Sequence, residues 1–208
     1  MFKKSNIPNF LTMLRIFLGL VVIILLSILI IFKKDVESRG SFKIDHFLLA
    51  AGIVFIAASV TDFLDGYIAR KYSYVSEFGK FFDPIADKVL INATLILFIP
   101  LGLIPFWITL ILILRDTVVD FIRMILSSKQ ITLSAGILGK LKTVFQMVGL
   151  SILFFLAYFV NFQGIETNDI ETKDIIIKQV ILIPMYIATA FSLISGVTYF
   201  IKAKSQLF

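Results

Sequence analysis

The sequence contains no cysteine and few charged residues. Without cysteine the chain cannot form disulfides, zinc–thiolate sites or iron–sulfur clusters, and it has no thiol nucleophile. Charged residues make up only 16% of the 208 residues, against about 25% in an average soluble domain. Hydrophobic residues make up 59% and fill whole helical turns in several blocks. The composition therefore excludes an ordinary water-soluble globule and predicts a membrane protein.

Apolar runs of membrane length predict six transmembrane helices. A bilayer core of about 30 Å needs roughly 20 helical residues. Runs of this kind lie at about 11–32, 47–70, 83–100, 106–127, 142–162 and 176–201. A tight turn at 101–104 separates the third run from the fourth, because proline and glycine interrupt a stretch too long for one span. We therefore predict an all-α, polytopic protein with a single transmembrane catalytic domain over residues 1–208.

The charge balance of 20 basic and 14 acidic residues gives a net charge of +6. We expect no nucleic-acid partner, because membrane topology and anionic lipid already account for basic residues at the ends of membrane helices. Six spans place both termini on one side, and that side collects most of the basic residues outside the spans. This asymmetry predicts cytoplasmic termini, with a short cytoplasmic segment over about residues 1–10.

Four aspartates lie where charged side chains are costly. Asp62 and Asp65 are three residues apart, and Asp83 and Asp87 are four apart, so each pair shares one helix face. A short loop joins the two helices, so the pairs are expected to meet across a helical hairpin. Facing carboxylates repel unless a cation lies between them, and oxygen ligands suit Mg²⁺, Mn²⁺ or Ca²⁺. The alternative is that they are helix caps or interfacial groups, with Asp83 before Pro84 at a helix start.

The same segment resembles the signature of the CDP-alcohol phosphatidyltransferase family. The matching positions, at fixed spacing, are Asp62, Asp65, Gly66, Ala69, Arg70, Gly79, Asp83 and Asp87. The resemblance implies a six-helix membrane enzyme, usually a homodimer, in which an alcohol displaces CMP from a CDP-linked lipid on the cytoplasmic side. It also implies that Asp62, Asp65 and Asp83 hold two divalent cations, Mg²⁺ or Mn²⁺.

Further roles follow from the same resemblance. Asp87 would lie beside the metals and act as general base, and Gly66, Ala69, Arg70 and Gly79 would contact the CDP moiety. The segment from Asn6 to Arg15 resembles the opening of bacterial phosphatidylglycerophosphate synthases, a group within this family. That similarity places Asn9 and Thr12 near the nucleotide. The alternative for Asn9 is the N-cap of the first helix.

A second polar segment carries four cations. Arg115 and Arg123 are eight residues apart and share a helix face, while Lys140 and Lys142 bracket the start of the fifth span. Guanidinium and ammonium groups bind phosphate, so a converging set predicts a phosphorylated acceptor. The segment also resembles the bacterial group above, whose acceptor is sn-glycerol 3-phosphate. The alternative is that the lysines are membrane-surface anchors and Arg115 pairs with Asp116 or Asp120.

The resemblance, with which the cations of the second segment agree, implies transfer of a phosphatidyl group from CDP-diacylglycerol to sn-glycerol 3-phosphate, with release of CMP. The resemblance implies a bacterial plasma membrane. Alternatives within the family use inositol phosphate or phosphatidylglycerol as the acceptor. An intramembrane prenyltransferase also binds diphosphate through metal-bridged aspartates, but on two distant segments, whereas all four aspartates here lie within 62–87. A cation transporter would not require the glycines and Arg70 of the motif.

Overall fold

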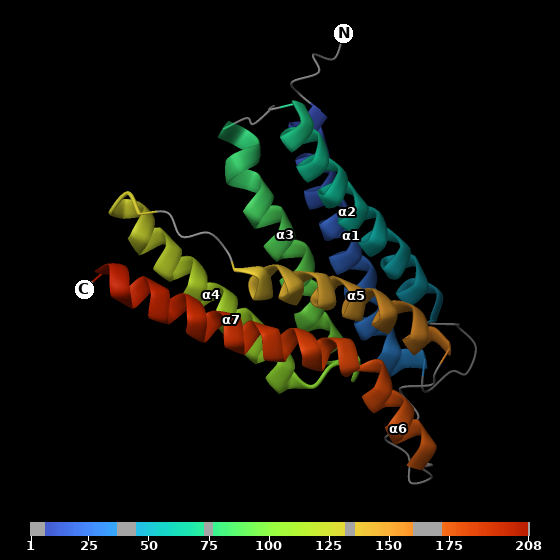
Figure 1. The fold of residues 1–208 in the computed structure, drawn as a ribbon. Coiled ribbons are helices and arrows are strands. Elements are labelled where there is room, and N and C mark those ends of the chain that lie inside the picture. The colour runs from blue at the N-terminus through green and yellow to red at the C-terminus, as the bar shows by residue number, and fades with distance from the viewer. Residues whose placement is uncertain (1–6, 37–44, 73–76, 132–135, 160–171, 208) are drawn as a thin grey trace. The chain divides into compact units, whose positions relative to one another are not determined.

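The computed structural model describes residues 7–36, 45–72, 77–131, 136–159 and 172–207, and side chains within 9–32, 46–62, 82–131, 136–156 and 175–206. The described residues form helices and contain no strand, which confirms the all-α prediction (Figure 1). The helices are α1 (Ile7–Val36), α2 (Asp45–Tyr72), α3 (Glu77–Phe98), α4 (Phe106–Ser128), α5 (Ile137–Phe159), α6 (Thr172–Ile181) and α7 (Ile183–Leu207).

Within the described residues, three helical segments are long and apolar enough to cross a bilayer, namely Asn9–Phe32, Ile137–Leu156 and Ile183–Gln206. A shorter apolar helical stretch covers His46–Asp62. Large apolar side chains lie on the outside of the helices, as Leu114, Val118 and Phe121 do on α4. Exposed apolar surface of this extent indicates contact with lipid. The chain is therefore a membrane protein, and the count of six spans stays a prediction.

Two predicted helix starts are wrong. We considered Asp83 as the cap of a helix beginning at Pro84, but α3 begins at Glu77 and Pro84 lies inside it. The helix accommodates the proline at the loss of one backbone hydrogen bond, since Pro84 has no N–H. Asn9 is likewise inside α1 and not its N-cap. Both residues therefore present their side chains from helix interiors.

A turn with glycine separates α3 from α4, and a break near a proline separates α6 from α7. The predicted turn between α3 and α4 is confirmed: Gly102 has a φ of +71°, and the N–H of Leu103 donates to the carbonyl of Phe98. The run predicted as one span over 176–201 is instead two helices, because α6 ends at Ile181 and α7 begins at Ile183. Pro184 explains the break, since it cannot donate the hydrogen bond that would continue α6.

The chain divides into two compact units. Unit 1 comprises Met1–Leu103 with Ser151–Gln163, and unit 2 comprises Ile104–Leu150 with Gly164–Phe208. In unit 1, α1 packs against both α2 and α3 (Figure 1). Phe154, from the last part of α5, packs against Phe55 of α2 and Phe98 of α3, with ring centroids 5.3 and 4.7 Å away. The prediction of a single domain stays a prediction.

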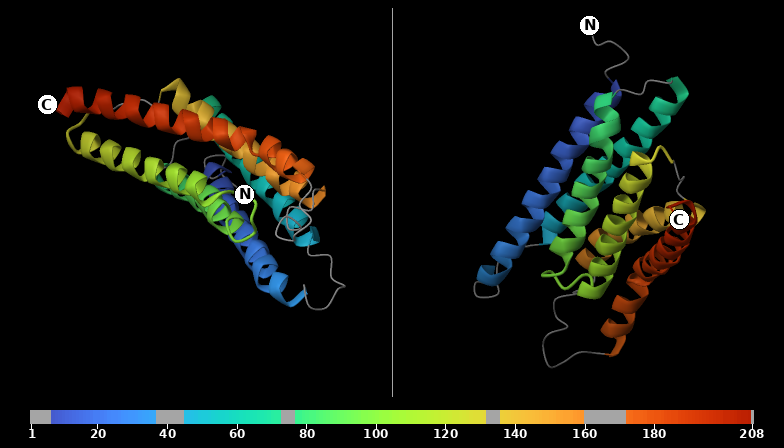
Figure 2. Two further views of the ribbon diagram at one scale, coloured as in Figure 1. Left: turned by 90° about the horizontal axis from the view of Figure 1, so that it is seen from below. Right: turned by 90° about the vertical axis from the view of Figure 1, so that its left-hand side faces the viewer.

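In unit 2, α4 and α7 lie side by side (Figure 2). Their buried contact consists of Val119, Ile122, Leu126, Tyr199 and Ala203. The first part of α5 packs against α7 in antiparallel register, because Phe145 contacts Phe191 and Gly149 lies against Met185. A Cβ at Gly149 would lie 2.6 Å from the Met185 Sδ atom, so a larger residue there would require the methionine side chain to move. This register determines which polar residues of α5 and α7 meet.

Candidate functional site

Three of the four motif aspartates have described side chains, and all three lie in unit 1. Asp62 is on α2, and Asp83 and Asp87 are on α3, one turn apart on the same face. Their side chains are half-buried. The sequence predicted that the two aspartate pairs meet across the α2–α3 hairpin, and because Asp65 lies outside the described side chains this stays a prediction.

Arg15 of α1 connects the two aspartate helices. Its Nη1 atom lies 2.9 Å from Oδ1 of Asp62 and 3.0 Å from Oδ1 of Asp87. Its side chain is 1% exposed. One turn earlier, the Thr12 hydroxyl donates to Oδ1 of Asp83 over 2.5 Å. Two side chains of α1 therefore contact the three described aspartates.

The pattern of α1 explains why these two polar groups face the aspartates. Residues spaced three and four apart form one buried stripe along the helix: Thr12, Arg15, Gly19, Val22, Leu26 and Leu29. The stripe is polar at its first two positions and apolar or small thereafter. A Cβ on Gly19 would lie 3.9 Å from the Cα of Leu90, so α1 and α3 approach closely just beyond the polar positions. Packing of the apolar residues of this stripe thus positions Thr12 and Arg15.

Sequence reasoning quoted Arg15 but assigned it no role. Arg15 is the one charged residue between Lys4 and Lys33, in a segment otherwise suited to lipid. A lone charge inside an apolar span needs a partner. That signal was available, but the sequence could not say which aspartates it contacts.

The residues able to hold a metal are the motif aspartates. Their carboxylate oxygens are the donors that Mg²⁺ and Mn²⁺ prefer. Among the side chains that the structure describes, no group of three or more acidic or histidine residues is close enough to form a complete metal site. The fourth motif aspartate, Asp65, lies outside these side chains. The donor chemistry therefore fits a divalent cation, and the ligand set stays a prediction.

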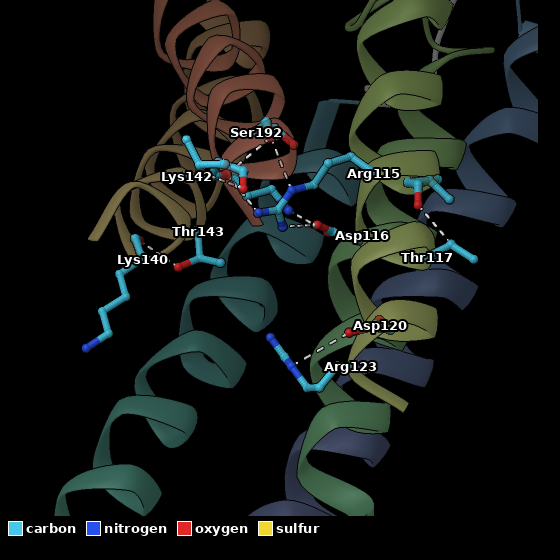
Figure 3. Close-up of polar contacts among 12 residues, drawn as sticks. Arg115, Asp116, Thr117, Asp120, Arg123, Lys140, Lys142, Thr143 and Ser192 are labelled. Carbon is cyan, nitrogen blue, oxygen red and sulfur yellow. Dashed lines mark hydrogen bonds and ion pairs between the residues drawn. The ribbon is translucent and has the colours of Figure 1, made fainter. Parts of the chain in front are cut away.

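A second polar cluster lies in unit 2 and joins α4 to α5 and α7 (Figure 3). Arg115 Nη1 lies 3.0 Å from Oδ1 of Asp116, and Lys142 Nζ lies 2.5 Å from its Oδ2. The two cations therefore share one carboxylate. The pairing of Arg115 with Asp116 was the alternative considered above, and the structure shows it. Lys142 is 3% exposed, so it is not a membrane-surface anchor.

Arg115 also makes contacts with α7. Its Nε donates to the carbonyl of Ser192 and its Nη2 to the hydroxyl of Ser195, at 3.1 and 2.7 Å. Gly196 of α7 leaves space for this side chain, whereas Gly139 of α5 lies at ordinary contact distance. A Cβ on Gly196 would lie 3.1 Å from Cγ of Arg115, and one on Gly139 of α5 would lie 3.8 Å from Nη2. Gly196 thus allows the Arg115 side chain to pack closely against α7.

The other two predicted acceptor cations do not join this cluster. Arg123 lies two turns further along α4, is 52% exposed and has its Nη1 3.8 Å from Oδ1 of Asp120. Lys140 is exposed, and its side chain extends away from Asp116 (Figure 3). Lys142 is buried and Arg115 is mostly buried, whereas Arg123 and Lys140 are exposed. Convergence of all four was expected, and the structure brings together only Arg115 and Lys142.

Gln146 lies one turn after Lys142 on the buried face of α5. Its side chain is 1% exposed, and neither its amide nitrogen nor its oxygen has a hydrogen-bond partner among the residues that the structure describes. A buried amide without partners is costly. The carboxamide is therefore a candidate for contact with a polar ligand.

Residues 5–200 match the family described as CDP-alcohol phosphatidyltransferase, a range that contains the aspartate motif and both polar clusters. The chain belongs to the CDP-alcohol phosphatidyltransferase family. The resemblance found from the motif is therefore confirmed.

Three similar proteins carry the name CDP-diacylglycerol–glycerol-3-phosphate 3-phosphatidyltransferase. The protein of that name from Mycoplasma pneumoniae is 37% identical over 196 residues, covering 92% of this chain and 85% of the relative. The one from Bacillus subtilis is 34% identical over 197 residues, covering 95% and 94%. The one from Rickettsia typhi is 34% identical over 203 residues, covering 97% and 98%.

Several motif positions of the chain fall outside the described side chains. They are Asp65, Gly66, Ala69, Arg70 and Gly79, so their predicted metal and CDP contacts stay predictions. Among the residues predicted near the nucleotide, Thr12 contacts Asp83, and half-buried Asn9 lies one turn before it on α1. This arrangement places Thr12 beside the aspartates expected to face the diphosphate.

Proposed function

We propose that the chain transfers a phosphatidyl group from CDP-diacylglycerol to sn-glycerol 3-phosphate, giving phosphatidylglycerophosphate and CMP. The observation that carries the proposal is the match of almost the whole chain to relatives of that single enzyme name. The convergence of motif aspartates on one face of α1 supports it, because the reaction needs clustered carboxylates beside a diphosphate. The reaction belongs to phospholipid biosynthesis in the membrane.

The proposed reaction depends on two divalent cations, Mg²⁺ or Mn²⁺. Asp62, Asp65 and Asp83 would hold them, with Asp87 alongside. Bound there, the cations would neutralise the diphosphate and stabilise the leaving phosphate. Thr12 and Arg15 hold the described carboxylates on one face of α1, which supports a common ligand for them.

Asp87 is the proposed general base. It accepts the proton of the acceptor hydroxyl as that oxygen forms a bond to the phosphorus bearing the diacylglyceryl group. The bond from this phosphorus to the bridging oxygen breaks, and CMP leaves with that oxygen. Arg15 contacts Oδ1 of Asp87, which leaves Oδ2 without that contact.

The acceptor phosphate is the proposed ligand of the cations in unit 2. Arg123 and Lys140 are exposed, so each would bind a phosphate without breaking a buried ion pair. Arg115 and Lys142 are tied to Asp116, so a phosphate would share them with that carboxylate. The unpaired carboxamide of Gln146 supports the proposal of a ligand with hydroxyl groups, since a carboxamide can both donate a hydrogen bond to a hydroxyl and accept one from it. Glycerol 3-phosphate carries both a phosphate and free hydroxyls.

The remaining parts of the proposal concern assembly and topology. We propose a homodimer in a bacterial plasma membrane, with both termini and the active site on the cytoplasmic side. The basic residues outside the predicted spans support this orientation. A cytoplasmic site would also give the soluble acceptor direct access.

CMP release by the detergent-purified protein tests the proposed function. CDP-diacylglycerol is the donor, with Mn²⁺, Mg²⁺ or EDTA, and the acceptors compared are glycerol 3-phosphate, inositol phosphate and phosphatidylglycerol. We expect release that requires both glycerol 3-phosphate and a divalent cation. Release with another acceptor would overturn the substrate assignment, and pyrophosphate release from a prenyl diphosphate would overturn the reaction class. Full activity in EDTA would overturn the metal assignment.

A further inference from the structure

Arg15 is a buried cation at the centre of the carboxylate site. A guanidinium stays protonated in proteins, so the charge cannot be removed by loss of a proton. Its side chain is 1% exposed and lies within the apolar helix α1, and burial of such a charge is costly unless it is paired. Through Nη1 it contacts Asp62 of α2 at 2.9 Å and Asp87 of α3 at 3.0 Å.

We propose that Arg15 is the resident counter-ion of this site, a positioning residue that keeps Asp62 and Asp87 together before a metal binds. The inference rests on the metal dependence in the proposed function. Carboxylates that converge without a cation repel one another. A fixed positive charge between them offsets this repulsion at all times, whereas a metal does so only when bound.

The contacts of α1 support a positioning role. Thr12 and Arg15 contact three motif aspartates, yet α1 supplies no carboxylate of its own at this point. Three carboxylates also outnumber the single guanidinium, so the site keeps carboxylate oxygens available to a divalent cation. α1 therefore aligns the ligands without replacing the metal, and pre-alignment lowers the cost of binding.

Loss of the guanidinium has a specific consequence in this view. Asp62 and Asp87 would then repel across α2 and α3, and a bound metal would be the main remaining cation able to hold them. The stability of the Arg15→Gln variant should therefore depend on metal more strongly than that of the wild type. A side chain that only fills space would show no such dependence.

Thermal unfolding of the full chain in detergent, in EDTA and in Mn²⁺, tests the proposal. In EDTA we expect Arg15→Gln to lower Tm by about 10 °C, as for loss of one partner of a buried pair. Mn²⁺ should restore most of that loss while changing the wild-type Tm far less. Arg15→Lys keeps the positive charge, so its Tm in EDTA should lie between those of the wild type and of Arg15→Gln. Lys204→Gln, which removes an exposed cation on α7, is the matched control and should behave as the wild type.

Two results would overturn the proposal: an Arg15→Gln variant as stable as the wild type in EDTA, or an equal loss of Tm with and without Mn²⁺. If Arg15→Gln does not fold, the Arg15→Gln/Asp87→Asn double variant decides, because removal of both charges should recover stability. No recovery in the double variant would also overturn it.

Mn²⁺ binding to the wild type, measured by electron paramagnetic resonance, separates this inference from the proposed function. Absence of Mn²⁺ binding would contradict the proposed metal dependence. The comparison of the single and double variants in EDTA would still test the counter-ion role of Arg15.

Discussion

The two polar clusters of the molecule have opposite charge arrangements. In unit 1, two carboxylates share one nitrogen of a single guanidinium, with a third carboxylate held by a neighbouring threonine. In unit 2, a guanidinium and an ammonium share the two oxygens of one carboxylate. The first cluster has excess negative charge, suited to a metal, and the second has excess positive charge, suited to a phosphate.

The difference shows two ways in which a membrane protein can keep several charges of one sign close together. Each cluster contains a resident group of the sign that its proposed ligand carries. Arg15 is positively charged, like the proposed metal, and Asp116 is negatively charged, like the proposed phosphate. Each resident group offsets part of the cost of burying like charges, while the remaining excess charge is available to bind the ligand.

The largest expected effect comes from removing a carboxylate of the cluster in unit 1. Asp62→Asn or Asp83→Asn should abolish turnover, because an amide is a poor substitute for a carboxylate on a divalent cation. CMP release from CDP-diacylglycerol measures this, with Asp120→Asn as a control acid outside the motif. Near-normal CMP release by either motif variant would contradict the metal assignment.

Asp87→Asn should act on the chemical step more than on donor binding. We expect kcat to fall by about 10²–10⁴-fold, the usual contribution of a general base. Binding of CDP-diacylglycerol, measured by calorimetry in detergent, should be retained. Activity within tenfold of the wild type would exclude Asp87 as the base.

Asp116→Asn tests whether the carboxylate in unit 2 is a structural counter-ion. Arg115 and Lys142 would lose their shared partner, and we expect a cost of about 3 kcal/mol, since one side of a mostly buried pair is removed. Thermal unfolding should show a Tm lower by about 6–12 °C.

Asp120→Asn is the matched control for this prediction. It lies one turn further along α4 and has an exposed partner, Arg123, at 3.8 Å, so its loss should cost less than the loss of Asp116. Equal Tm losses for the two variants would contradict the counter-ion role of Asp116.

Arg123→Ala should weaken acceptor binding without unfolding the protein. The side chain is half-exposed and weakly paired, so we expect Tm to change little and the apparent KM for glycerol 3-phosphate to rise by about tenfold, as for loss of one charge-assisted contact. Steady-state CMP release at varied acceptor concentration measures it. An unchanged KM would assign Arg123 to membrane anchoring.

Gln146→Leu should produce the smallest effect on activity. It tests whether the side chain contributes to acceptor binding or to stability. Since the buried amide has no partner among the described residues, an apolar side chain of similar size should leave Tm equal or higher. The KM for glycerol 3-phosphate should rise by a few-fold through loss of a neutral hydrogen bond. A lower Tm with unchanged KM would show that the amide is structural.

Helix positions and the acidic motif followed largely from sequence patterns. The apolar runs predicted α1, α2 and α4 closely, and the spacing of Asp83 and Asp87 predicted their common face. The breaks were harder to predict. Pro184 divides α6 from α7, while Pro84 lies inside α3. The same residue type therefore ends one helix and is accommodated in another, because neighbouring packing decides which outcome costs less.

The sequence by itself determined the membrane class, the family and the identity of the chemical groups, because composition, spacing and residue type are local properties of the chain. Tertiary structure alone decided the partners. Arg15 contacts aspartates about 50 and 70 residues away in sequence, and Arg115 packs closely against α7 at Gly196. Such contacts depend on helix register and close approach across the fold, which no periodicity within one helix specifies.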